Sequence, residues 1–204
     1  LRAIPGRNKA MDKQEVKAFF DRCAGSWDAE TVRNEAVISE ILDHAGVVSG
    51  SDVLDVACGT GVLIPDYLAR NVHSITAIDL SEEMIRIARS KYPQPNVRFF
   101  CGDAETYLFD RCFDCIVIYN AFPHFPHPEH LIATLSQQLK PGGILTVAHG
   151  MSRAALDRHH QSCADQVSLG LMHEDLLAEL FSRYLTPCVK ISNQQMYQVA
   201  GKKE

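Results

Sequence analysis

The chain has 204 residues, 46% of them hydrophobic, and its 20 Lys and Arg against 25 Asp and Glu give a formal net charge of −5. This length suits one domain with a sizeable core. An acidic balance without a basic run argues against a nucleic-acid partner, and no apolar stretch approaches the roughly 20 residues of a membrane span. Seven scattered cysteines favour reduced thiols, and hence a cytoplasmic protein.

The hydrophobic pattern predicts alternating helices and strands along most of the chain. Helices are expected at 12–22, 31–45, 62–70, 82–91, 128–139, 152–168 and 173–184. Strands are expected at 52–56, 74–79, 97–101, 114–120 and 143–149, with a closing antiparallel hairpin of 187–192 and 195–200. This order predicts an α/β fold of the Rossmann-like, doubly wound type, with a mostly parallel seven-stranded sheet and a C-terminal antiparallel hairpin.

We expect residues 1–204 to form a single domain with four parts. Residues 1–48 are expected to be an N-terminal helical cap, and 49–150 the cofactor-binding core. Residues 151–172 exceed a simple connection, so they are expected to form a lid or insertion helix. Residues 173–204 supply the last helix and the closing hairpin.

The run Val53-Leu54-Asp55-Val56-Ala57-Cys58-Gly59-Thr60-Gly61 reads as a buried strand that ends in a tight glycine turn before a helix. Glycine lets a ligand approach the main chain closely, and open α/β sheets bind ligands at such turns. The dinucleotide fingerprint G-x-G-x-x-G would need a third glycine where Ile64 stands. An NAD-dependent oxidoreductase is therefore a weaker alternative.

Two acidic residues follow the next two predicted strands. Asp79 ends the second strand, where its carboxylate can accept both ribose hydroxyls of an adenosine-containing cofactor; the alternative is a cap for the helix that starts at Glu82. Gly102-Asp103-Ala104 follows the third strand. There a carboxylate can accept from the adenine amino group, and a neighbouring backbone N–H can meet a ring nitrogen.

These segments, with 113–122 and 139–145, resemble in order the motifs of the class I S-adenosylmethionine-dependent methyltransferases over about residues 50–150. The segments 19–21 and 26–28 resemble the N-terminal cap of members that methylate small molecules. The resemblance implies S-adenosylmethionine as cofactor, held by Asp55, Ala57, Gly59, Gly61, Asp79, Leu80, Asp103, Ala104 and Asn120.

The acceptor is expected to be a small molecule. The family signature for methylation of amide or base amino groups, Asn-Pro-Pro-Tyr, is replaced here by Asn-Ala-Phe-Pro at 120–123. An oxygen, sulfur or carbon nucleophile is therefore favoured over nitrogen. Phe122 and Phe125 are expected to form an aromatic wall that suits a partly apolar acceptor, and the N-terminal helices around Trp27 are expected to close the other side of the substrate site. A non-catalytic sensor that binds S-adenosylmethionine remains an alternative, and the sequence indicates no oligomeric state.

Six of the nine histidines follow the fourth and fifth predicted strands, whose ends meet at one edge of a parallel sheet. His149 ends the fifth strand, and His160 shares a helical face with Leu156. His124, His149 and His160 could together hold a divalent metal such as zinc or iron. Alternatively His124 or His149 acts as a general base without metal, or the histidines are structural.

Overall fold

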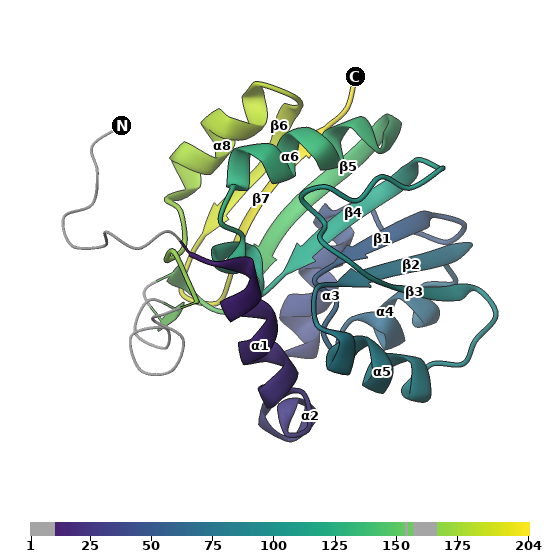
Figure 1. Ribbon diagram of the computed structural model, residues 1–204. Helices are drawn as coiled ribbons and strands as arrows, with labels where there is room; N and C mark the ends of the chain where they lie inside the picture. The colour runs from purple at the N-terminus through teal and green to yellow at the C-terminus, as the bar shows by residue number, and fades with distance from the viewer. Residues whose placement is uncertain (1–10, 154, 157–166) are drawn as a thin grey trace.

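The computed structural model describes residues 11–153, 155–156 and 167–204, and within them seven strands form one sheet in the order β3-β2-β1-β4-β5-β7-β6 (Figure 1). Neighbouring strands from β3 to β5 pair in parallel, whereas β7 runs antiparallel to both β5 and β6. The predicted doubly wound sheet and closing hairpin are confirmed. The strands are β1 (Asp52–Val56), β2 (Ser74–Asp79), β3 (Val97–Cys101), β4 (Phe113–Tyr119), β5 (Leu139–His149), β6 (Thr186–Ser192) and β7 (Tyr197–Lys202).

Helices cover both faces of the sheet, which is why most strands are apolar throughout. Buried side chains of α3, α4 and α5 pack with one face of β1, β2 and β4, and those of α6 and α8 pack with the opposite face. The described helices are α1 (Lys13–Cys23), α2 (Trp27–Glu30), α3 (Glu35–His44), α4 (Ile64–Ala69), α5 (Glu82–Lys91), the 3₁₀ helix η1 (Phe122–His124), α6 (Pro128–Gln137) and α8 (Glu174–Ser182).

The helix predicted at 31–45 is wrong in its first turn, because the chain forms α2 and then restarts as α3. Asn34 caps α3, since its side chain accepts a hydrogen bond from the N–H of Val37 at 3.3 Å. Arg33 forms an ion pair with Asp66 of α4, with 2.9 Å between Nη2 and Oδ2, and this contact fixes the break between α2 and α3 against α4. A polar cap and a long-range ion pair therefore override the helical pattern.

The fifth strand is longer than predicted. It begins at Leu139 rather than at 143, so α6 ends at Gln137 and the turn 141–143 lies inside β5. The ladder between β4 and β5 shifts register between Phe113 and Cys115, which accommodates these residues as a bulge. The predicted helix 152–168 lies mostly outside the described residues.

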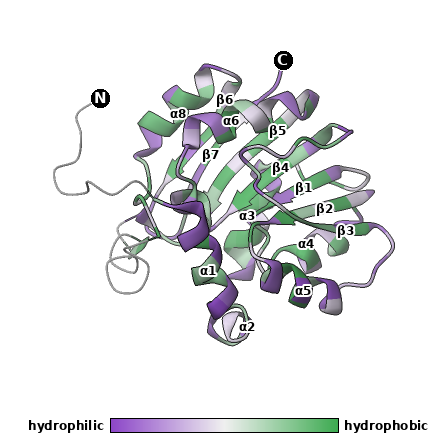
Figure 2. Ribbon diagram, in the orientation of Figure 1, coloured by the Kyte–Doolittle hydropathy of each residue, from purple (hydrophilic) through white to green (hydrophobic). Residues whose placement is uncertain are grey.

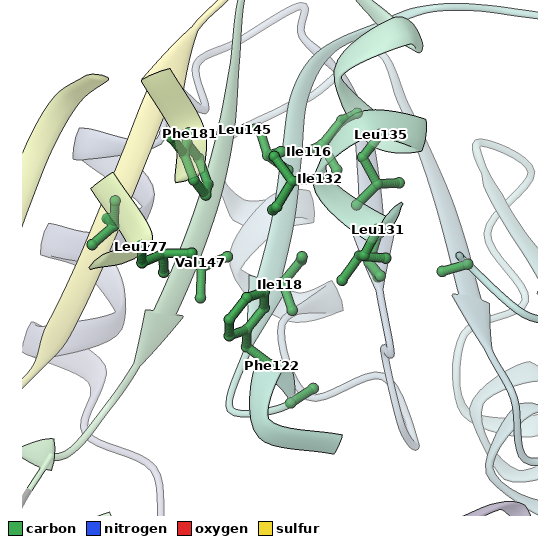
Figure 3. Packing of buried hydrophobic residues seen from close by; sticks show 14 of the residues in the cluster. Ile116, Ile118, Phe122, Leu131, Ile132, Leu135, Leu145, Val147, Leu177 and Phe181 are labelled. Atoms are coloured by element: carbon green, nitrogen blue, oxygen red, sulfur yellow. The ribbon is translucent and has the colours of Figure 1, made fainter. Parts of the chain in front are cut away.

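The larger core cluster joins the sheet to α6 and α8. Figure 2 shows the central strands as largely hydrophobic, whereas α1 and α5 carry hydrophilic segments. In Figure 3, Phe122 points into the cluster beside Ile118. Phe122 is only 3% exposed. Its ring therefore packs in the core, behind the position expected for an aromatic wall.

The parallel strands bring their carboxyl ends together, and we call this side, with the loops that follow β1 to β4, the carboxyl edge. Helices α1 and α2 lie at the end of the sheet toward which the arrows of β1 and β4 point (Figure 1). No helix among the described residues is long and apolar enough to cross a membrane.

Candidate active site

The glycine turn after β1 has a backbone conformation that requires glycine at residue 61, the second of its two glycines. Gly61 has φ +87°, and a Cβ added there would lie 2.6 Å from Cε2 of Tyr92 and 3.1 Å from Cγ1 of Ile64. Ala57 has φ +55°, a left-handed conformation that is strained for an L-residue. The turn is closed by a hydrogen bond from the N–H of Gly61 to the carbonyl oxygen of Cys58 at 2.9 Å.

Asp79 is held at the tip of β2 by the main chain on both sides. Its Oδ2 accepts from the N–H of Gly59 and its Oδ1 from the N–H of Ser81, each at 2.8 Å. Burial raises the pKa of Asp79 to about 6, against the lowering effect of these two N–H groups. The carboxylate is therefore mostly ionised at pH 7, and each oxygen keeps a lone pair for a further donor.

Asp55 differs from Asp79, which lies on the neighbouring strand β2 two positions beyond Ala77, the partner of Asp55. Its side chain is 2% exposed, and its Oδ2 has no hydrogen-bond partner among the described residues. Burial, followed by the negative charge of Asp79, raises the pKa of Asp55 to about 8. Asp55 is thus mainly protonated at neutral pH, which avoids two adjacent buried charges.

Asp103 begins the loop after β3. Its Oδ1 accepts from the N–H of Glu105 at 3.0 Å, and its Oδ2 lies 2.5 Å from Nζ of Lys13. Ala104 is buried. Asp103 therefore stands at the carboxyl edge beyond Asp79, because β3 is the neighbour of β2.

The loop after β4 also lies at the carboxyl edge, on the side of β1 away from β2 and β3. Asn120 has φ +54°, and its Oδ1 accepts from the N–H of Gly150, which ties the end of β4 to the end of β5. His124 follows in η1, with its Nδ1 2.7 Å from the carbonyl oxygen of Val167. Because a carbonyl oxygen only accepts, Nδ1 carries the hydrogen, and in the neutral ring Nε2 carries the lone pair.

An aromatic cluster joins His124 to the N-terminal helices. The Phe20 ring lies edge-to-face with the rings of His124 and Trp27, at centroid distances of 5.0 and 5.6 Å. The indole Nε1 of Trp27 is 3.5 Å from the position of a Cβ added to Gly59, so Trp27 also reaches the glycine turn. Leu80 and Phe20 both pack against a small cluster that contains Val16 of α1 and Val167.

The histidines are placed differently from one another. His149 is fully buried, on the face of β5 that carries Val147, and its ring lies 6.1 Å from that of Tyr197. His160 lies outside the described residues, so the set of His124, His149 and His160 stays a prediction. Within the described ranges no group of three His, Cys, Asp or Glu side chains could hold a metal ion. Phe125 is half-buried and packs against the core cluster.

The described chain resembles known proteins over its central part. A profile described as a methyltransferase domain matches residues 53–143. The malonyl-[acyl-carrier protein] O-methyltransferase of Acetivibrio thermocellus is 33% identical over 138 residues, which cover 66% of this chain and 49% of that protein. The ubiquinone biosynthesis O-methyltransferase of Coxiella burnetii is 30% identical over 143 residues, covering 66% and 61%. By these matches the chain resembles the class I S-adenosylmethionine-dependent methyltransferases.

Solved structures confirm the fold of the chain. The DhpI-SAM-HEP complex superposes with a TM-score of 0.74 at 20% identity, covering 98% of this chain and 100% of that one. The [4+2]-cyclase SpnF gives a TM-score of 0.71 at 22% identity, covering 88% and 75%. One fold thus carries more than one chemistry, and the chain spans only 49% and 61% of the two curated relatives named above. The fold alone therefore does not identify the reaction.

The order of groups along the carboxyl edge fits S-adenosylmethionine. Asp103, Asp79 and the glycine turn follow β3, β2 and β1, which are consecutive neighbours in the sheet. Adenine, ribose and the methionine part follow in the same order along the cofactor, and adjacent strands are about 4.8 Å apart. An ionised Asp79 with one lone pair left on each oxygen suits two ribose hydroxyls.

Sequence reasoning missed the contacts that bind the N-terminal helices to the loops after β1 and β3. Lys13 pairs with Asp103 and Glu105, and Asp28 accepts from Oγ1 of Thr60 at 2.5 Å. These partners are 32 to 92 positions apart in the sequence, from the pair of residues 28 and 60 to the pair of residues 13 and 105. Neither a helix-capping motif nor the helical period predicts pairs that are this far apart.

Proposed function

We propose that this methyltransferase transfers the methyl group of S-adenosylmethionine to the oxygen of a small hydroxylated molecule, with His124 as general base. The hydrogen bond from Nδ1 of His124 to the carbonyl oxygen of Val167 carries this proposal. It fixes the tautomer and the ring orientation, so that Nε2 is the nitrogen able to take a proton.

The cofactor supplies a methyl group on a positively charged sulfur, which a nucleophile attacks directly. The protein binds the two reactants in line, excludes water and removes the acceptor proton. Asp79 and the glycine turn would hold the cofactor, and Asp103 would receive its adenine amino group. Nε2 of His124 would accept the hydroxyl proton as the new oxygen–carbon bond forms and the bond between the methyl carbon and sulfur breaks, which leaves S-adenosylhomocysteine. Val167 would stabilise the resulting imidazolium through its carbonyl oxygen.

The surroundings of His124 support a small acceptor with an apolar body. Phe20 packs edge-to-face on His124, and Trp27 packs on Phe20 in turn, so the base lies beside aromatic rings. Such rings favour a flat or hydrocarbon-rich partner. The two curated relatives named above are O-methyltransferases, which supports oxygen as the atom methylated.

The test is a panel of small hydroxylated acceptors assayed for formation of S-adenosylhomocysteine. Replacement of His124 by alanine should lower turnover by about 100-fold to 10,000-fold, the range of general acid–base catalysis. It should leave the affinity for S-adenosylhomocysteine within about threefold, which is a change of less than about 1 kcal/mol in binding free energy. Replacement of the exposed His130 in α6 is the matched control and should change neither quantity.

Each alternative gives a different result in the same experiment. Undiminished turnover of the His124 variant would refute the base. Binding of S-adenosylhomocysteine without turnover of any acceptor would favour the sensor, and binding of NAD instead would favour the oxidoreductase. Loss of turnover on chelation, restored by zinc or iron, would favour the metal set of His124, His149 and His160.

A further inference from the structure

One lysine of the N-terminal helix α1 serves two carboxylates of the loop after β3. Nζ of Lys13 lies 2.5 Å from Oδ2 of Asp103 and 2.5 Å from Oε2 of Glu105. The two acids differ in their access to water, because the side chain of Asp103 is 25% exposed and that of Glu105 is fully buried. The same ammonium group therefore has one partner that water can solvate and one that it cannot.

Glu105 also connects the cofactor side of the edge to the acceptor side. Its Oε1 accepts from the N–H of His127 at 2.9 Å, and its main-chain carbonyl accepts from Oγ1 of Thr134 at 2.9 Å. A buried carboxylate is costly unless it is paired and hydrogen-bonded. Glu105 thus needs Lys13, whereas Asp103 can lose it and remain solvated.

Helix α1 reaches the other loops of the carboxyl edge as well. Oδ1 of Asp21 accepts from Oγ of Ser81 at 2.6 Å, next to Asp79, and Phe20 contacts His124. Figure 1 shows α1 at this end of the sheet. A contact that holds α1 down therefore covers the loops to which a cofactor binds.

We propose that Lys13 is a positioning residue for the cofactor, shared by Asp103 and Glu105 in the free protein and held by Glu105 alone once the adenine amino group takes Asp103. This proposal rests on the proposed function, which assigns adenine to Asp103. Lys13 then keeps α1 closed over the bound cofactor, because its ion pair with the buried Glu105 persists. Lys13 and Glu105 together act as a latch that sets how fast the cofactor binds and its product leaves.

The latch predicts opposite effects for two substitutions. Glu105→Gln keeps an oxygen for the N–H of His127 but removes the charge, so Lys13 stays on Asp103 and competes with adenine. Affinity for S-adenosylhomocysteine should fall about tenfold or more, the effect of losing a hydrogen bond to a charged group. Adding Lys13→Met to Glu105→Gln should restore affinity to within about threefold, because Asp103 is freed, but association and dissociation should both become about tenfold faster.

The measurement is stopped-flow binding of S-adenosylhomocysteine followed by the fluorescence of Trp27, the single tryptophan of the chain. The matched control is Lys17→Met, one turn further along α1, whose side chain is equally exposed at 29% but pairs with Asp21. It should leave both rates within about twofold, since exposed ion pairs contribute little. A merely structural role would lower the melting temperature of the double variant without changing its rates.

The outcomes separate the latch from the proposed function. If the double variant binds with the affinity and rates of the wild type, or if Glu105→Gln alone binds as tightly as the wild type, the latch is refuted while the cofactor assignment stands. If the wild type binds no S-adenosylhomocysteine, the proposed function fails, and the latch fails with it. Weak binding by Glu105→Gln that Lys13→Met reverses supports the latch.

Discussion

Alanine in place of Gly61 should destabilise the protein through two separable effects. The left-handed φ of +87° costs an L-residue about 1–2 kcal/mol. In addition the new Cβ would lie 2.6 Å from Cε2 of Tyr92 and 3.1 Å from Cγ1 of Ile64, and such overpacking costs about 1–3 kcal/mol. We therefore expect Gly61→Ala to lower the free energy of unfolding by about 2–5 kcal/mol in urea denaturation.

Gly50 offers a control with nearly the same backbone. Its φ is +85°, and a Cβ there would meet no atom within 4 Å. Gly50→Ala should therefore show the backbone cost alone, about 1–2 kcal/mol before the gain from a stiffer unfolded chain. Gly61→Ala with Tyr92→Ala should recover part of the difference. Equal destabilisation by the two glycine substitutions would refute the reasoning, because it would mean that Tyr92 does not constrain the glycine turn.

Three further substitutions test the electrostatics and packing of the site. The pKa of Asp55 is raised in the folded protein, so the contribution of Asp55 to stability is greatest below about pH 4 and is lost as the pH rises toward 8. Over this range the free energy of unfolding should fall by up to about 1.4 kcal/mol per pH unit. Asp55→Asn should remove this fall in urea unfolding from pH 4 to 9. Ala57→Gly should be neutral or stabilising by up to about 1 kcal/mol in thermal unfolding, since it relieves a φ of +55°, and a clear loss of stability would contradict the strain. His149→Ala should lower the free energy of unfolding by about 2–4 kcal/mol, because it empties a fully buried position, and an unchanged midpoint would contradict that burial.

Local pattern sufficed for the parts of the fold that depend on local chemistry. The strands β1, β2 and β3 have the predicted bounds, because β1 and β2 are largely buried and mostly apolar and because Val97 and Phe99 of β3 are buried. Ser81 caps α5 as its position before two glutamates indicates, with its Oγ accepting from the N–H of Met84 at 3.1 Å. The break before Glu35 had a signal in Asn34, but the continuous apolar pattern outweighed it.

The candidate site was predictable only up to its backbone. Strand order brings Asp79 and Asp103 to one edge, and the sequence predicts that much. The bond of His124 to Val167 spans 43 positions, and the burial of His149 depends on its register with Tyr197 in β7. The partner of Lys13 is set by how α1 crosses the loops. These contacts arise from tertiary packing, which no local period encodes.

The central claim is that the carboxyl edge binds S-adenosylmethionine, and one calorimetric titration tests it directly. S-adenosylmethionine, S-adenosylhomocysteine and NAD are titrated in turn into the wild type and into Asp79→Asn. We expect the first two to bind at one site per chain and NAD to show no heat of binding. Asp79→Asn should weaken binding about tenfold or more, because it removes a charged hydrogen-bond acceptor. Binding of NAD, or equal affinity of the Asp79 variant, would contradict the account.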